Sequence, residues 1–225
     1  MPRKLTGTMA LEALRQEVRF TRAALKADPD ACDLLSETDA WSGQVTAMRD
    51  LEDGVQDAEA DADACFAVAN QRLDRSCIRF ANAKLVSLGM DRSSSQFTRY
   101  FKVPPSDFVR QPLADQRSAV EGWLTVTEDS VLEAHRPELS TWSGKGLEAL
   151  SMMSAQSQCV ATHRTKRETL AAVLTSARDA LHRSLAGRAD ALSLGREWPD
   201  TFFKKEGARP AKATPSSTAE PASPT

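Results

Sequence analysis

Apolar residues recur every three or four positions along two long parts of the chain, Trp41–Leu88 and Trp142–Leu194. This spacing places apolar side chains on one face of an α-helix. Neither part contains a proline, which would remove a backbone donor and interrupt a helix. The pattern predicts two long amphipathic helices, with Gly54 as the weak position inside the first.

A shorter apolar pattern precedes each long one. The first covers residues 8–27 and is followed by Pro29, and the second covers residues 113–135 and is followed by Pro137. The residue before a proline disfavours the helical conformation. We therefore expect a short helix before each long helix, with the two prolines as stops.

Several fragments occur in both halves of the chain. Trp-Ser-Gly stands at 41–43 and 142–144, Leu73–Ser76 resembles Leu181–Ser184, and Tyr100–Lys102 resembles Phe202–Lys204. The separations differ between these pairs, so a duplication requires insertions. We expect a tandem duplication with pseudo-repeats at about 8–103 and 112–206. Chance similarity between amphipathic helices is the alternative interpretation.

These elements predict an all-α fold. We expect an elongated antiparallel helical bundle of coiled-coil type, built from two similar halves that each contribute a short and a long helix. Residues 1–206 would form a single domain, with 50–63 lying opposite 169–182. Residues 207–225 are rich in Pro, Ala, Ser and Thr, which predicts a disordered C-terminal tail.

Composition narrows the classes of partner. The formal net charge of −2 argues against a nucleic-acid or anionic-membrane partner, because such proteins usually carry a clear basic excess. No apolar stretch approaches the ~20 residues of a transmembrane helix, and no secretory signal is recognised at the N-terminus. Cys32, Cys65, Cys77 and Cys159 show no Cys-x-x-Cys spacing. Reduced, mostly structural cysteines in a cytoplasmic protein are expected.

The segment from Asp50 to Asp63 contains acidic side chains throughout and no Lys or Arg. Its predicted partner segment offers too few basic residues to neutralise it. A solvated helix face is the favoured interpretation. A docking patch for a basic partner is the alternative.

Cys159 and His163 are the best candidates for chemistry. Their spacing of four places them on one face of a helix, where they would supply two zinc ligands or a thiol beside a base. A core cysteine beside a boundary histidine is the structural interpretation. His163 and His182 would lie ~28 Å apart along one helix, too far to share a metal. We assign no catalytic residue, metal ligand or cofactor.

Aromatic residues are concentrated just after each long helical pattern. They flank several basic residues and would either cap the ends of the bundle or form an exposed patch that binds a partner. The candidate partner-binding residues are Phe97, Tyr100, Phe101, Trp198, Phe202 and Phe203.

Long amphipathic patterns without a convergent catalytic motif predict a non-catalytic helical scaffold or protein–protein interaction module. The expected partner is another protein, with homo-oligomerisation left open. One alternative is a small-ligand or zinc-binding helical-bundle enzyme that uses the Cys159/His163 region. A further alternative is an amphipathic coat protein on a lipid or polymer surface.

Overall fold

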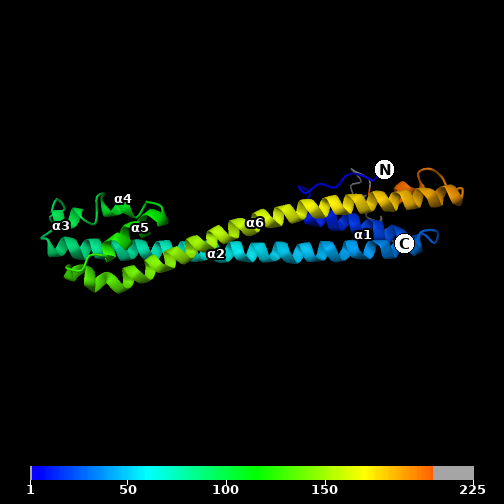
Figure 1. The fold of residues 1–225 in the computed structure, drawn as a ribbon. Helices are drawn as coiled ribbons and strands as arrows, with labels where there is room; N and C mark the ends of the chain where they lie inside the picture. Colours follow the sequence, from blue (N-terminus) through cyan, green and yellow to red (C-terminus); the bar gives the residue numbers. More distant parts are fainter. Residues whose placement is uncertain (1, 205–225) are drawn as a thin grey trace, which may run out of the picture. The chain divides into compact units, whose positions relative to one another are not determined.

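The computed structural model describes residues 2–204, and this part of the chain is all-α, with no strand (Figure 1). The all-α prediction is confirmed. The predicted disordered tail, 207–225, lies outside the described residues. In chain order the elements are α1 (Leu11–Ala27), η1 (Cys32–Thr38), α2 (Asp39–Ser87), α3 (Ser95–Thr98), α4 (Pro105–Phe108), α5 (Leu113–Leu124), α6 (Ser130–Ala191) and η2 (Trp198–Phe202).

The chain divides into two compact units. Unit 2 is the continuous segment Asp50–Thr165, and unit 1 holds the residues before and after it. Because α2 and α6 cross these limits, each unit contains one part of each long helix. The units therefore differ from the predicted pseudo-repeats, since each takes residues from both halves of the chain.

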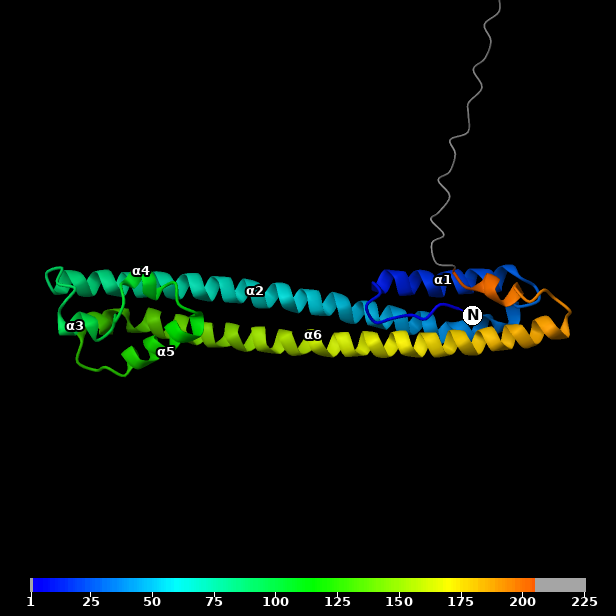
Figure 2. The ribbon, with the colours of Figure 1, turned by 90° about the horizontal axis from the view of Figure 1, so that it is seen from above.

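In unit 1, α1 lies beside the first turns of α2 and the last turns of α6 (Figure 2). The apolar stripe of α1 faces a core that includes Leu14, Leu174 and Phe202. The N-terminal segment lies on α6, where the Leu5 amide donates a 3.1 Å hydrogen bond to Thr175 Oγ1. Gly7 suits this close approach, because a Cβ there would stand 2.5 Å from Glu168 Cγ.

A buried ion cluster lies within unit 1. Glu17 and Arg178 are both fully buried, and their side chains pair at 2.9 Å. Arg3 also pairs with Glu17, and the Arg178 guanidinium lies 5.2 Å from the Phe203 ring centroid. Burial lowers the pKa of Arg178, which the negative charge of Glu17 opposes. Loss of one partner would leave a buried unpaired charge, so the cluster links the N-terminal segment, α1 and α6.

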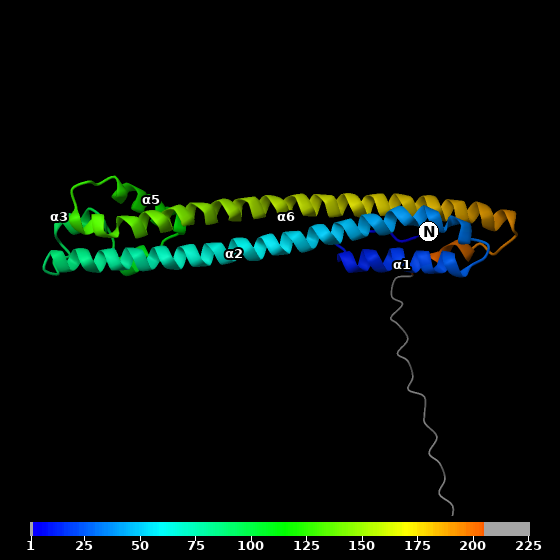
Figure 3. The same ribbon diagram turned by 90° about the horizontal axis from the view of Figure 1, so that it is seen from below.

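In unit 2, α3, α4 and α5 lie together beside the end of α2 and the start of α6 (Figures 2 and 3). Their core is aromatic: Phe80, Phe101 and Trp123 pack with ring centroids 4.8–6.0 Å apart. The two long helices run antiparallel here, and Arg79 of α2 pairs with Glu138 of α6 at 3.0 Å. The short helices α3 and α4 lie in the segment between α2 and α5.

The start of α6 differs from the prediction. The helix expected to run to residue 135 ends at Leu124, and α6 begins at Ser130 and continues through Pro137. Asp129 Oδ1 starts it by accepting 3.1 Å bonds from the amides of Val131 and Leu132. Leu132 and Leu139 are fully buried on either side of Pro137. This burial offsets the hydrogen bond that proline cannot donate, so Pro137 does not stop the helix.

The earlier start of α6 changes the register of the long helices. Cys65 and Val68 of α2 share a groove with Ala149 and Met152 of α6. Continued along the antiparallel helices of unit 2, this contact and the Arg79–Glu138 pair place residues 50–63 opposite about residues 151–164, whereas residues 169–182 belong to unit 1. The predicted pairing of 50–63 with 169–182 was therefore wrong.

Buried positions in the two halves recur at a nearly constant spacing. Buried residues of α2 match buried residues of α6 that lie 101 positions later: Leu73 with Leu174, Cys77 with Arg178, and Phe80 with Leu181. Buried residues of α1 and α5 match at a spacing of 102: Leu14 with Gln116, and Val18 with Val120. The resemblance of Leu73–Ser76 to Leu181–Ser184 does not follow this register. The duplication stays a prediction, with this register as its support.

Candidate functional site

The six aromatic candidates lie in or against the two cores. Five of them are buried, and Trp198 is half-buried. Their polar tips bind loops before the long helices: the Tyr100 hydroxyl donates to Asp129 at 2.8 Å, and Trp198 Nε1 donates to Asp28 at 2.9 Å. The expectation of an exposed aromatic patch does not match this burial. Partner binding through these residues would require the cores to open, and it stays a prediction.

Asp129 also forms a buried ion pair in unit 2. Its carboxylate lies 2.5 Å from Lys84 Nζ, and both side chains are more than nine-tenths buried. Burial and the hydrogen bond to Asp129 raise the pKa of Tyr100 to about 12. Burial alone would raise the pKa of Asp129, but the bonds from Lys84 and the Leu132 amide outweigh it, so that pKa is lowered. These groups bind one another and join α2 to the residues just after α3 and just before α6.

Cys159 and His163 lie on α6 in unit 2. Cys159 is exposed, so the interpretation of a core cysteine was wrong for this residue, whereas His163 is half-buried as expected. His163 Nε2 is buried and has no hydrogen-bond partner among the described residues. Within residues 2–204, no cluster of three or more His, Cys, Asp or Glu side chains is placed to hold a metal. Three protein ligands are the usual minimum for catalytic zinc.

An open apolar groove lies between α2 and α6 in unit 2. Its volume is about 310 Å³, and apolar side chains dominate its lining. Val68 is 53% exposed and Met152 is 37% exposed, so both remain accessible. The lining residues are Ala64, Cys65, Val68, Ala69, Trp142, Lys145, Glu148, Ala149 and Met152.

Carboxylates continue this groove along α2. Asp57, Asp61, Cys65 and Val68 are spaced by three or four residues, so they share one side of the helix. Asp57 and Asp61 form no ion pair with any of the described residues. Lys145, which lines the groove, pairs instead with Glu148 at 2.7 Å. We call Asp57, Asp61 and the groove the open face of unit 2.

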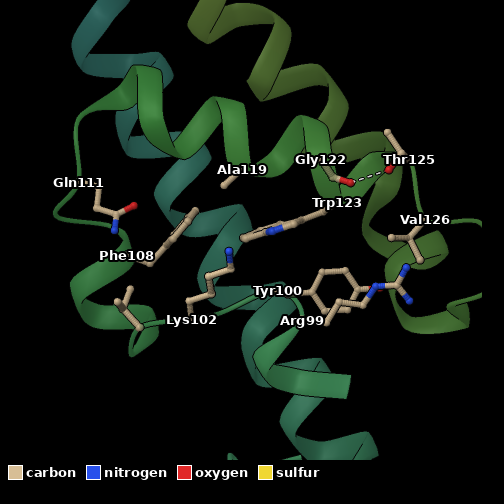
Figure 4. Close-up of a pocket in the computed structure, with 11 residues that line it drawn as sticks. Arg99, Tyr100, Lys102, Phe108, Gln111, Ala119, Gly122, Trp123, Thr125 and Val126 are labelled. Carbon is tan, nitrogen blue, oxygen red and sulfur yellow. Dashed lines mark hydrogen bonds between the residues drawn. The ribbon is translucent and has the colours of Figure 1, made fainter. Parts of the chain in front are cut away.

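A second cavity lies between residues 99–111 and α5 (Figure 4). Its volume is about 430 Å³, and sequence reasoning did not find it. The sequence alone does show that the cationic residues Arg99 and Lys102 stand next to the aromatic residues Tyr100 and Phe101. The contribution of α5 depends on tertiary packing. The lining residues are Arg99, Tyr100, Lys102, Val103, Phe108, Gln111, Ala119, Gly122, Trp123, Thr125 and Val126.

Comparison with known proteins adds no relative to these observations. No protein-family model, curated protein or solved structure matches the chain. Among residues 2–204, no helix combines the length and the hydrophobicity needed to cross a membrane.

Proposed function

We propose that the protein is a non-catalytic interaction module whose open face binds a basic amphipathic helix of another protein. One observation carries the proposal: an accessible apolar groove continues into carboxylates for which no ion partner is recorded among the described residues. Amphipathic helices commonly dock their apolar stripe in such grooves. Lys or Arg side chains on the partner would then meet Asp57 and Asp61.

Charge favours a basic partner over a second copy of this chain. The α2 segment from Asp50 to Asp63 holds no basic residue, and Lys145 is already paired with Glu148. Two such faces brought together would place like charges against each other, which disfavours association. A Lys- or Arg-rich helix supplies the missing charge and also fills the groove.

The buried ion pairs support a structural role for the charged residues in the two cores. Glu17 with Arg178 and Lys84 with Asp129 are paired inside the protein. Their carboxylates and cations hold segments of the fold together. The zinc-site and amphipathic-coat alternatives stay predictions.

A designed peptide tests the proposal directly. A fluorescently labelled Lys/Leu peptide with apolar residues at helical spacing should bind the full-length protein, as measured by fluorescence anisotropy. A scrambled peptide of the same composition should bind at least about tenfold more weakly, because it cannot present one apolar stripe. A Glu/Leu peptide with the same spacing should not bind, because its charge matches that of the open face.

Two double variants locate the binding. Asp57→Asn with Asp61→Asn should weaken binding about tenfold or more, since two charge contacts are lost. Glu59→Gln with Asp63→Asn removes the same charge from the opposite flank of α2 and should change affinity less than about threefold. Equal losses in both double variants would show general electrostatic attraction and would contradict a specific site.

A further inference from the structure

We infer that the 430 Å³ cavity beside α5 binds a planar aromatic molecule carrying one carboxylate or sulfonate group. This small-molecule site is separate from the protein-binding function proposed above. The inference depends on one observation: fixed aromatic rings and two cations that form no ion pair with the described residues line the same cavity. Its volume lies in the range of small-ligand sites, ~300–1,000 Å³.

The aromatic wall of the cavity is held by the core of unit 2. The Phe108 and Trp123 ring centroids lie 5.1 Å apart with an interplanar angle of 31°. Tyr100 meets Trp123 edge-on, with centroids 6.0 Å apart at 86°. All three side chains are buried over most of their surface, so their edges line the cavity without further ordering. A preformed wall of this kind favours a flat ring system.

The cavity lining carries positive charge. Arg99 and Lys102 are exposed, and the Lys102 side chain points toward the Phe108 and Trp123 rings in Figure 4. No ion pair is recorded for either cation in residues 2–204, and the cavity has no acidic lining residue. Several other cations of the same unit are paired, among them Arg79 with Glu138 and Arg117 with Glu121. The site therefore attracts an anion that the protein itself does not supply.

The position in unit 1 that corresponds to Ala119 holds a larger, packed side chain. At the spacing of 102 that relates buried residues of α1 to those of α5, Ala119 corresponds to Glu17. Glu17 is fully buried and pairs with Arg178. Unit 2 thus places a small side chain at the cavity where unit 1 places a packed, paired one.

The probe for the test is 8-anilinonaphthalene-1-sulfonate, a fused-ring monoanion, added to the full-length protein. It should bind with one-to-one stoichiometry by calorimetry and shift the indole N–H resonance of Trp123 in nitrogen-15 spectra. The Trp41 resonance should not shift. N-phenyl-1-naphthylamine, which has the same rings without the sulfonate, should bind about tenfold or more weakly.

Three variants assign the site. Arg99→Gln with Lys102→Gln should weaken binding of the anionic probe about tenfold or more while leaving that of the neutral probe within about twofold. Gly122→Leu should abolish both, because Gly122 lines the cavity and a Cβ there meets no atom within 4 Å. Arg110→Gln removes a nearby exposed cation that does not line the cavity and should have no effect.

Each variant is checked by thermal unfolding, so that loss of binding is not confused with loss of fold. Equal affinity for the anionic and neutral probes would overturn the charge-recognition role. Unchanged binding in the native-like Gly122→Leu variant, or a Trp123 resonance that does not move, would overturn the site. Neither result would bear on peptide binding at the open face.

Discussion

Asp74 is a partly buried carboxyl on α2, and its surroundings favour the neutral form. Asn70 donates a 3.3 Å hydrogen bond to its Oδ2, whereas Oδ1 is buried without a partner among the described residues. Burial raises the pKa of Asp74, and a contact with Gln116 only partly opposes the shift. The Gln116 amide nitrogen is already engaged by the carbonyls of Val109 and Gln111.

The raised pKa predicts a pH dependence of stability. The folded state holds the Asp74 proton more tightly than the unfolded state, so the stabilisation is complete below the ordinary pKa of 3.8 and is lost as pH rises through the folded pKa. Asp74→Asn should remove this decline in stability with rising pH, and it should raise the denaturant midpoint of unfolding at neutral pH. Chemical denaturation from pH 4 to pH 8 measures the free energy of unfolding of both proteins.

Asp61→Asn, an exposed change on the same helix, is the matched control for Asp74→Asn. It removes one negative charge without altering a buried group. It should leave the pH profile of the wild-type protein nearly unchanged. A similar profile for Asp74→Asn would mean that Asp74 ionises normally in the folded protein.

At the scale of elements, the two long helices end in similar ways. The Met90 amide donates to the Leu85 carbonyl and the Leu194 amide donates to the Ala189 carbonyl, both at 2.8 Å. These bonds close the last turn, as in the Schellman motif. The left-handed residues differ, because Gly89 and Met90 adopt positive φ after α2, whereas Ser193 does so after α6. The left-handed position that closes each motif is therefore filled by Gly89 after α2 and by Ser193 after α6.

Pro137 lies inside α6, which leads to a prediction about that helix. Pro137→Ala should raise the free energy of unfolding by about 1–3 kcal/mol, because alanine restores a backbone donor and removes a steric conflict. Helix content by circular dichroism should stay constant, since the residues on both sides are already helical.

Pro112→Ala is the control for Pro137→Ala. Pro112 stands at the N-cap of α5, where no intrahelical donor is missing, so little stabilisation is expected. A clear rise in helix content for Pro137→Ala would indicate instead that the proline ends a helix, as the sequence pattern predicted.

At the scale of the whole molecule, each unit buries its own hydrophobic core. Leu14 belongs to the core of unit 1 and Leu139 to that of unit 2, and both side chains are fully buried. The open face and the aromatic cavity both belong to unit 2. The two cores can therefore be perturbed separately.

Leu14→Ala and Leu139→Ala should destabilise different parts of the chain. Each leaves a cavity that costs about 2–5 kcal/mol. By hydrogen exchange, Leu14→Ala should deprotect α1 more than α5, and Leu139→Ala should do the reverse. Equal deprotection of both helices by either variant would show that the two cores open as one cooperative unit.

Sequence periodicity determined that the chain is helical and where most helices lie. The stripes in α1 and α2 were predicted to within a few residues, because helix formation depends on neighbours three and four positions apart. The excess of acidic residues on α2 was also predicted, because it can be read directly from the sequence. The aromatic segments were identified, although not their burial.

Tertiary packing decided the remaining features. Leu132 and Leu139 are buried on either side of Pro137, and α6 continues through this proline. The register of the two long helices then places Cys65 and Val68 beside Met152. The aromatic cavity required residues 99–111 to meet α5. These outcomes depend on contact free energies between residues distant in the chain, which local spacing does not contain.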